Sequence, residues 1–510
     1  MGLLSNALPS YQGPYPVSTL DLELPAASPR TDFSPALLKS TGQPALKLDT
    51  TLVTLFYPAN DHRKGSGARQ PWLDRPLSRT AEGYARFVGR NPWLIKALIY
   101  LVGARVRLPV EADQGLAFKL DPKGKNSQGE KATPARPATA GSASALVGDE
   151  LAEGDQTFPL VVFSHGLSGT RTTYSQWCGE IASHGYIVAA VEHRDGSSPV
   201  SVVRLENGEE RVVDYIRAEE HLVFPPPNPP QTSLQFRSSQ LLLRLAEVRE
   251  ALTILERLNA GNGAAIAAEN RRGGEGVGKW LEGWKGRVGL EEAVMAGHSF
   301  GGATTIQALR AGATSFPFVR GIALDPWADP IPPAPSMPAF SSLTSTTSER
   351  SNPAPTTEAA DGEKGQGEVP LDVKVPLLVI NSEAFTVWRV HYKLVRGIVE
   401  AVEGGRGWLM TLVGSIHTTF SDLPLLLPSF LSGRSGSRIT PPILGTARIV
   451  EACRELLAGE GGAGTILGQP VREGDERGAR PGEGEKDEKG RKREMEGDIG
   501  SMRMHVRGRG

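Results

Sequence analysis

Hydrophobic residues follow two different patterns along this chain. In residues 14–60 apolar and polar positions alternate, as in the Leu-Asp-Leu-Glu-Leu run at 20–24, which predicts antiparallel strands. Later apolar runs are short and continuous, and helical patterns separate them, which is typical of parallel strands covered on both faces. These runs are residues 158–163, 186–191, 294–296, 319–324, 375–380 and 408–413. We therefore expect an α/β fold with a mostly parallel central sheet flanked by helices.

Three segments fall outside this pattern because they hold few apolar residues. Residues 121–157 are rich in Gly, Ser, Ala, Lys and Pro, and residues 331–372 in Pro, Ser, Thr and Glu. We expect both to be low-complexity, disordered insertions. Residues 459–510 are rich in Gly, Glu, Lys and Arg and are expected to form a disordered charged tail. One α/β domain over residues 1–458 then accounts for the ordered chain.

Residues 92–103 are apolar on almost every side and include one lysine, Lys96. The segment is too short to span a bilayer. It is either a helix buried in protein or a helix that lies in a lipid interface, with Trp93 and Tyr100 at the level of the headgroups. No run of about eighteen apolar residues occurs in the chain, so no transmembrane helix is expected.

The net charge and the cysteine content limit which classes of protein and which cellular compartments fit the sequence. The formal net charge of the 510 residues is −1, so nucleic-acid binding is not expected. The two cysteines, Cys178 and Cys453, make no disulfide framework, which fits a reducing compartment. The N-terminus lacks the features of a signal peptide, and Asn6 stands where a myristoylation motif has Ser or Thr. We expect a cytoplasmic protein, with membrane association left open.

A Gly-x-Ser-x-Gly motif at residues 297–301 gives the first chemical signal. An apolar run precedes the motif and a helical pattern follows it. A serine on a sharp turn between a strand and a helix is the nucleophile of many hydrolases, and the glycines relieve crowding at that turn. Ser299 is therefore the candidate nucleophile. The alternative is a plain glycine turn.

A nucleophilic serine needs a base, and in hydrolases built on this turn the base follows the serine in the chain. Three histidines do so. His391 lies in a helical pattern and His505 in the predicted tail, whereas His417 lies in a loop just after the strand 408–413. His417 is the candidate base.

The residues alone leave the identity of the orienting acid open. Asp325 ends the strand that follows the nucleophile helix, and Glu383 ends the next strand. Either position suits a carboxylate that orients the base. Asp422, five residues after His417, is a weaker candidate that is expected to cap a helix or lie at the surface.

An oxyanion hole at such a site takes one backbone N–H from the residue after the nucleophile, which here is Phe300. A second N–H comes from an earlier loop between a strand and a helix. The His-Gly-Leu-Ser loop at residues 165–168 follows the strand 158–163, and Leu167 is its simplest donor.

Other polar residues are assigned structural roles. His165 is expected to shape its own loop. His193 and Asp195 precede the serine, which is the wrong order for a base and acid here, and are expected in a turn near the rim of the site. No metal-ligand spacing and no phosphate-binding or dinucleotide motif is found in the sequence, so neither metal nor cofactor is expected.

Six blocks of sequence carry a resemblance to a known family. They are residues 160–167, 182–195, 297–303, 321–327, 380–383 and 414–417. In their order over about residues 14–430 they resemble the platelet-activating factor acetylhydrolases of the plasma and intracellular type II kind, which are relatives of lipoprotein-associated phospholipase A2. The resemblance implies an α/β-hydrolase fold. It also implies a calcium-independent serine esterase that removes short or oxidised sn-2 acyl groups from phospholipids through an acyl-enzyme.

The resemblance implies site residues as well. The family's acid lies in a Leu-Asp-x-Trp block, which is residues 324–327 here and favours Asp325 over Glu383. The family's oxyanion donors match Leu167 and Phe300. Its members bind lipid surfaces through apolar helices, one of them in the N-terminal part, and the segment from Trp93 to Val102 lies in that region.

The chain also departs from the family, and other functions stay open. The two insertions and the charged tail are not family features, and the acyl-pocket residues are not evident from the sequence. A general carboxylesterase acting on soluble esters would use the same three residues. A non-catalytic binding protein with a hydrolase fold would need none of them. The oligomeric state is left unknown.

Overall fold

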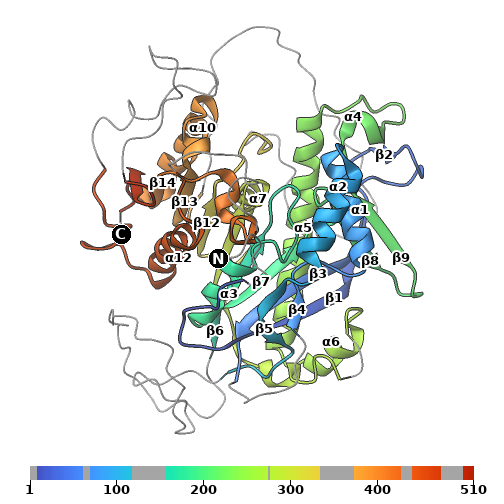
Figure 1. The fold of residues 1–510 in the computed structure, drawn as a ribbon, viewed down its shortest axis with the longest axis horizontal. Coiled ribbons are helices and arrows are strands. Elements are labelled where there is room, and N and C mark those ends of the chain that lie inside the picture. Colours follow the sequence, from blue (N-terminus) through green and yellow to red (C-terminus); the bar gives the residue numbers. More distant parts are fainter. Residues whose placement is uncertain are drawn as a thin grey trace.

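The computed structural model describes residues 8–60, 69–117, 157–273, 276–332, 373–426, 439–471 and 498–509. Within these residues a sheet of eleven strands runs through the molecule (Figure 1). Its strands are β1 (Val17–Arg30), β3 (Leu48–Pro58), β4 (Arg69–Pro71), β5 (Arg107–Ala112), β6 (Phe158–Ser164), β7 (Ile187–Glu192), β11 (Val288–His298), β12 (Arg320–Leu324), β13 (Leu377–Ser382), β14 (Gly407–Leu412) and β15 (Met502–Val506).

The order of the strands across the sheet is β15-β14-β13-β12-β11-β6-β7-β3-β1-β5-β4. The six neighbours from β14 to β7 are all parallel. The first long strands, β1 and β3, pair antiparallel with each other, and β3 pairs antiparallel with β7. The chain therefore crosses outward from β6 to β7 and returns to β11 at the centre. This is the α/β-hydrolase fold, so the predicted fold class is confirmed.

Helices cover both faces of the sheet. The helices are α1 (Leu77–Val88), α2 (Pro92–Gly103), α3 (Ser175–Ser183), α4 (Ala218–His221), α5 (Ser233–Asn259), α6 (Gly263–Glu269), α7 (Phe300–Ala311), α9 (Glu383–Thr386), α10 (Arg389–Glu400), α11 (Leu423–Leu426) and α12 (Pro442–Ala458). Short pieces are the pairs β2 (Leu37–Leu38) with β10 (Leu222–Val223) and β8 (Val200–Arg204) with β9 (Glu210–Asp214), and the turns η1 (Leu281–Trp284), η3 (Glu403–Gly405) and η4 (His417–Phe420).

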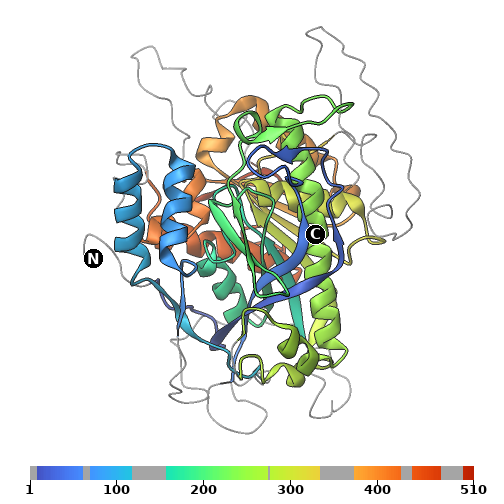
Figure 2. The same cartoon turned by 90° about the vertical axis from the view of Figure 1, so that its right-hand side faces the viewer.

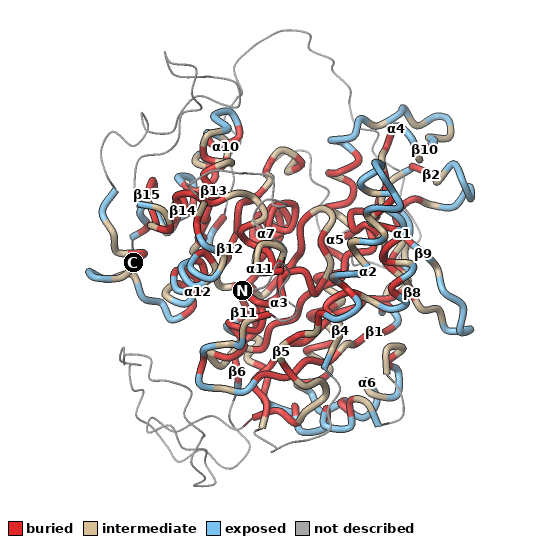
Figure 3. The backbone as a smooth tube through the Cα atoms, in the orientation of Figure 1, coloured by how far each residue is buried: buried red, intermediate tan, exposed pale blue. Residues whose placement is uncertain are grey.

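Alternate residues of the central strands point into two separate hydrophobic cores. Along β6, Leu160 and Val162 pack with residues of α5, α6, α7 and α10, whereas Val161 and Phe163 pack with residues of α3 and α12. Both faces are covered, so β6 and β7 are buried along almost their whole length (Figure 3). This accounts for the continuous apolar runs in the sequence, because successive side chains of a strand face opposite sides.

The longest helix, α5, starts at a complete capping box. The Thr232 side chain accepts a hydrogen bond from the Gln235 backbone N–H, and the Gln235 side chain accepts one from the N–H of Thr232. Leucines and valines of the helix join the cores. The helix also buries charged side chains, among them Arg244 and Glu247. Buried charges need polar partners, and these lie near the carboxyl ends of the central strands.

The apolar segment at residues 92–103 forms α2, which packs beside α1 away from the long α5 (Figure 2). The interpretation as a helix buried in protein is wrong. Trp93 is 72% exposed and Leu101 56%, and Leu94 and Tyr100 are exposed as well. Among the described residues, no helix has both the length and the apolar character needed to cross a membrane.

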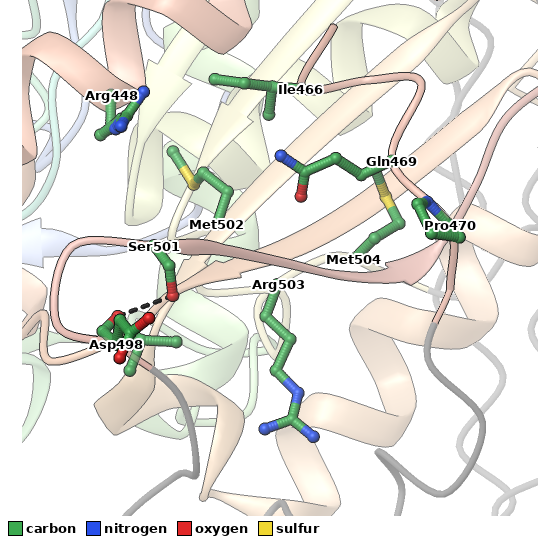
Figure 4. A pocket seen from close by; sticks show the side chains of 10 residues that line it. Arg448, Ile466, Gln469, Pro470, Asp498, Ser501, Met502, Arg503 and Met504 are labelled. Carbon is green, nitrogen blue, oxygen red and sulfur yellow. Dashed lines mark hydrogen bonds between the residues drawn. The ribbon is translucent and has the colours of Figure 1, made fainter. Parts of the chain in front are cut away.

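The prediction of a disordered tail over residues 459–510 is wrong for its last described part. Residues 502–506 form β15, which pairs antiparallel with β14 and extends the sheet beyond the predicted domain boundary at 458. Met502 and Met504 are buried in the core, and the intervening residues are charged or polar. This alternation is only five residues long and lies in a charged tail whose composition predicts disorder. The strand was therefore not predicted. Beside β15 lies a cavity of about 610 Å³, lined by Arg448, Gln469 and both methionines among others (Figure 4).

The insertions predicted over 121–157 and 331–372 lie outside the described residues except at 157, 331 and 332. The Gly-rich stretch 260–284 contains α6 and η1. Gly263 is required there, because a Cβ at this position would lie 2.2 Å from the Leu281 carbonyl oxygen.

Candidate active site

Ser299 lies on a strained turn between β11 and α7, as the motif predicts. Its backbone has φ 56° and ψ −117°, a conformation that side-chain-bearing residues rarely adopt. The flanking glycines permit the turn: a Cβ on Gly297 would lie 2.2 Å from the Gly301 oxygen, and a Cβ on Gly301 1.9 Å from the Ser164 oxygen. The Ser299 N–H donates to the Leu324 carbonyl at 2.9 Å, which ties the turn to the neighbouring strand.

The structure brings Ser299, Asp325 and His417 together. His417 Nε2 lies 2.9 Å from Ser299 Oγ, and His417 Nδ1 lies 2.7 Å from Asp325 Oδ2. Asp325 can only accept from the ring, so Nδ1 carries the proton and Nε2 is free to accept from the serine hydroxyl. Asp325 is fully buried, whereas about a third of the His417 side chain is exposed. This arrangement has the geometry that an activated serine nucleophile requires.

Asp325 is held by backbone contacts at the end of β12. Its φ is 43°, and its own N–H donates to the Ile380 carbonyl at 2.7 Å. Its second carboxylate oxygen, Oδ1, accepts the Ser382 N–H at 2.7 Å. One oxygen is thus anchored to β13 and the other faces His417, which fixes the direction of the carboxylate.

His417 lies between two aromatic rings. Its ring stacks on Phe385 with centroids 4.4 Å apart and planes at 6°, and the His298 ring lies 4.5 Å away on a tilted plane. The His417 backbone carbonyl accepts the Nε2–H of His298 at 3.1 Å. Both the ring and the backbone of the candidate base are therefore held in place.

His298, the residue before the nucleophile, links the base loop to the 165–168 loop. With its Nε2 proton donated to His417, its Nδ1 must accept, and the Tyr174 hydroxyl donates to it at 2.8 Å. The same hydroxyl accepts the Gly166 N–H at 3.2 Å. Burial keeps the pKa of His298 well below its ordinary value, and the nearby His417 acts in the same direction. A neutral His298 fits both hydrogen bonds. No sequence pattern indicates these roles of His298 and Tyr174, although His298 lies inside the motif.

The two predicted oxyanion donors lie in segments next to the nucleophile. Phe300 is the first residue of α7, where backbone N–H groups have no partner within the helix. Leu167 follows Gly166, and a Cβ on Gly166 would lie 2.8 Å from Ser299 Cβ. The glycine therefore allows the loop to approach the serine closely. Leu167 and Phe300 also share a small apolar cluster with Leu241, Ala303 and Trp327.

The other two candidate acids, Glu383 and Asp422, each stabilise a different segment of the chain. Glu383 starts α9, and its Oε2 accepts the Gly414 N–H at 2.8 Å, so it supports the loop that carries His417. Asp422 accepts hydrogen bonds from Trp72 Nε1 and from backbone N–H groups at the start of α3. Asp422 thus caps α3, but it is buried and not at the surface. Burial raises the pKa of Asp422 to about 7.

His193 and Asp195 are not at the rim of the site, so that expectation is wrong. Both are fully buried. His193 is hydrogen-bonded to Ser164 Oγ and to Glu247, each at 2.7 Å. His165 does lie within its loop, where Nδ1 donates to the Gly166 carbonyl at 2.9 Å. These buried polar groups are hydrogen-bonded to one another. The sequence pattern of a single strand does not indicate such contacts between segments.

The two remaining histidines after the nucleophile also have structural contacts. His391, on α10, accepts the Ala328 N–H at 3.0 Å. His505 lies in β15 and contacts Thr411 at 2.8 Å, so its assignment to a disordered tail is wrong. Neither approaches Ser299 through a described hydrogen bond.

His298, Asp325 and His417 lie close enough to share a metal ion, with ligand atoms within 4.8 Å of one another. All four histidine nitrogens already have hydrogen-bond partners, as do both oxygens of Asp325. These side chains and Ser299 therefore already form a hydrogen-bonded network. A metal ion would need to displace the Asp325–His417 contact.

Several known proteins are similar in sequence to this chain. A family model described as platelet-activating factor acetylhydrolase, isoform II, matches residues 138–336, which include Leu167, Ser299 and Asp325. A platelet-activating factor acetylhydrolase of Gallus gallus is 27% identical over 281 residues, which cover 54% of each chain. One of Bos taurus is 34% identical over 184 residues, 34% of this chain and 36% of the relative. A putative phospholipase A2 of Schizosaccharomyces pombe is 27% identical over 308 residues, 58% of each chain.

The match therefore covers less than two thirds of each relative's length. The matched part of the chain nevertheless contains the nucleophile turn and the strand ends around it. The family model and the relatives agree with the sequence blocks: residues 138–336 match the model of platelet-activating factor acetylhydrolase, isoform II, and the chain is similar to platelet-activating factor acetylhydrolases.

Proposed function

We propose that this protein is a calcium-independent serine esterase that hydrolyses short or oxidised sn-2 acyl groups of phospholipids. The observation that carries the proposal is the continuous hydrogen-bond chain from Ser299 through His417 to Asp325. The relatives are named platelet-activating factor acetylhydrolase and putative phospholipase A2, which supports the substrate class.

In the proposed mechanism Ser299 Oγ attacks the ester carbonyl while His417 Nε2 takes the hydroxyl proton. Asp325 keeps the proton on Nδ1 and stabilises the imidazolium that forms. The N–H groups of Leu167 and Phe300 hold the negative charge on the carbonyl oxygen. His417 then returns its proton to the leaving alcohol oxygen, and an acyl group remains on Ser299. Water, activated by His417, releases the acid and restores the serine.

Phospholipid substrates are presented at an interface, and the exposed side of α2 is suited to such a surface. Trp93, Leu94, Tyr100 and Leu101 expose large apolar groups there. A single face of apolar and aromatic side chains on a short helix is typical of proteins that lie on lipid. We therefore include peripheral contact with a lipid surface in the proposal, through α2.

The test compares a short-acyl phospholipid with a water-soluble ester of the same acyl group, above and below micelle formation and in EDTA. We expect the phospholipid to be cleaved in EDTA, with a rise in rate at the interface. Ser299→Ala should lower kcat by at least about 10³-fold and abolish fluorophosphonate labelling in the folded protein.

Two other results would support the alternative functions. Cleavage of the soluble ester without phospholipid cleavage would identify a general carboxylesterase. Folded wild-type protein that neither turns over an ester nor reacts with a fluorophosphonate would identify a non-catalytic binding protein. Loss of phospholipid cleavage in EDTA would contradict calcium independence.

A further inference from the structure

A fully buried arginine, Arg244 of α5, lies behind the candidate oxyanion hole. Its exposed fraction is 0%, and its guanidinium donates its shortest hydrogen bonds to two segments, the loop at residue 165 and the turn at residues 195–197. Nη1 donates to the His165 carbonyl, Nη2 to Ser197 Oγ and Nε to Asp195 Oδ2, each at 2.7 Å. A guanidinium that served only to neutralise Asp195 would not need the contact with residue 165.

These contacts fix both ends of the loop that presents Leu167. On one side, the His165 carbonyl accepts from Arg244. On the other side, the Ser168 N–H donates to the Ser197 carbonyl at 2.8 Å, and Ser197 is itself a partner of Arg244. Leu167 therefore lies between two anchors that share one arginine.

The same guanidinium also contacts the segment that presents the second donor. Its central carbon lies 4.2 Å from the centroid of the Phe300 ring, within the range of a cation–π interaction. Because the ring is fully buried, this contact is desolvated. One planar group thus touches both the loop of Leu167 and the side chain of Phe300.

The charge of Arg244 is balanced within this cluster. Asp195 is fully buried and accepts from Arg244 and from the Ser197 hydroxyl. Burial opposes ionisation of Asp195, but the Arg244 charge and the Ser197 hydrogen bond outweigh it and hold the pKa of Asp195 below its ordinary value. The ion pair therefore persists at neutral pH, and the guanidinium cannot reorient without exposing a buried carboxylate.

We propose that Arg244 is a positioning residue that sets the spacing between the Leu167 and Phe300 N–H groups. This inference rests on the proposed function, in which those two groups bind the oxyanion. A lysine at 244 keeps the charge that pairs with Asp195, but its compact ammonium cannot also reach the His165 carbonyl and lie flat on the Phe300 ring. The spacing should then relax without loss of the ion pair.

The test measures steady-state kinetics of Arg244→Lys on a soluble short-acyl ester, with Arg194→Lys as the matched control. Arg194 is also buried, with hydrogen bonds to Glu23 at 2.8 Å and Thr50 Oγ1 at 2.6 Å on β1 and β3. For Arg244→Lys we expect kcat to fall about 10- to 100-fold with KM changed less than about threefold. The pH at which the base titrates in the kcat profile should not move, because His417 and Asp325 are untouched.

Arg194→Lys should lower the melting temperature to a comparable extent while kcat stays within about threefold of wild type. A folded Arg244→Lys with wild-type kcat would overturn the inference and leave the serine esterase intact. Equal losses of kcat in both variants would also overturn it, because they would indicate general destabilisation. Activity that survives Ser299→Ala would instead overturn the proposed function.

A second variant covers the case in which Arg244→Lys does not fold. Ser197→Ala removes the partner of Nη2 and leaves Arg244 and Asp195 paired. We expect a smaller fall in kcat in the same direction, with KM again unchanged. Wild-type kcat in folded Ser197→Ala, together with failure of Arg244→Lys to fold, would reduce Arg244 to a purely structural role and refute the proposal.

Discussion

Asp325 Oδ2 lies 2.7 Å from His417 Nδ1, whereas the rival acid Glu383 accepts a hydrogen bond from the backbone of Gly414. The two carboxylates end neighbouring strands and both act on the loop of the candidate base. Asp325 is hydrogen-bonded to the His417 ring through Oδ2, while its Oδ1 accepts the Ser382 N–H. Asp325 can therefore set the tautomer of His417, whereas the Gly414 contact of Glu383 supports the loop that carries His417.

The first prediction follows from this difference. Asp325→Asn replaces the acceptor by a group that can donate to Nδ1, which favours the wrong tautomer, so kcat should fall by about 10³- to 10⁴-fold. Glu383→Gln keeps an oxygen that can accept the Gly414 N–H and should retain most activity. Steady-state hydrolysis of a soluble ester by the two variants decides between the acids. Near-normal activity of Asp325→Asn beside an inactive Glu383→Gln would reverse the assignment.

Gly166 provides a second prediction, on the loop that approaches the nucleophile. A methyl group there would lie 2.8 Å from Ser299 Cβ and 3.1 Å from the Tyr174 hydroxyl, so Gly166→Ala should push the loop away from the serine. A displacement of this kind should lower kcat by about 10²-fold. Gly397→Ala is the matched control, because a methyl on this residue of α10 meets no atom within 4 Å. It should leave kcat unchanged and raise the free energy of unfolding by about 0.5–1 kcal/mol.

Much of the fold and of the candidate site could be predicted because the relevant signals are local. Continuous apolar runs indicated the parallel strands, and the positions of Ser299 and His417 just past strand ends brought them to one edge of the sheet. The buried polar cluster could not be predicted in this way. His193 and Asp195 are 54 and 49 residues away in sequence from their partners Glu247 and Arg244, and only the tertiary packing brings these pairs together.

The tail and the segment 92–103, for which two alternatives stayed open, were hard to predict for a different reason: the average composition of each segment does not show how its residues pack. The five-residue strand β15 alternates correctly, but it lies within a stretch of charged residues that predicts disorder. The apolar α2 has the composition of a buried helix, yet only its contact with α1 and the core is covered. Whether an apolar helix is covered depends on what packs against it, and its own sequence does not contain that information.

The exposed side of α2 leads to a third prediction. Replacing Trp93 and Leu101 by serine removes two of its largest exposed apolar groups, which are 72% and 56% exposed. The double variant should bind phospholipid vesicles more weakly and lose the rise in rate at the interface, while kcat on a soluble ester stays the same. Ile443→Ser on α12, 53% exposed, is the control for general loss of surface hydrophobicity. Equal vesicle binding by wild type and double variant, measured by co-sedimentation, would contradict lipid contact through α2.

The last prediction concerns the pH dependence of stability and uses His505 of β15. This side chain is buried, contacts Thr411 Oγ1 at 2.8 Å and packs against the Tyr392 ring. Burial, assisted by the charges of Arg503 and Arg396, lowers the pKa of His505 to about 3.

An unfolded histidine binds a proton below about pH 6.5, so between pH 6.5 and 3 the unfolded chain holds a proton that the folded chain excludes. Stability should therefore fall as the pH falls through this range, by about 1.4 kcal/mol per pH unit from this residue alone. His505→Gln can keep the contact with Thr411 and does not titrate. Between pH 7 and pH 5, urea unfolding should show wild type losing about 2 kcal/mol more than this variant, since the other buried histidines are common to both. Parallel losses in the two proteins would mean that His505 is already protonated in the folded chain at pH 5.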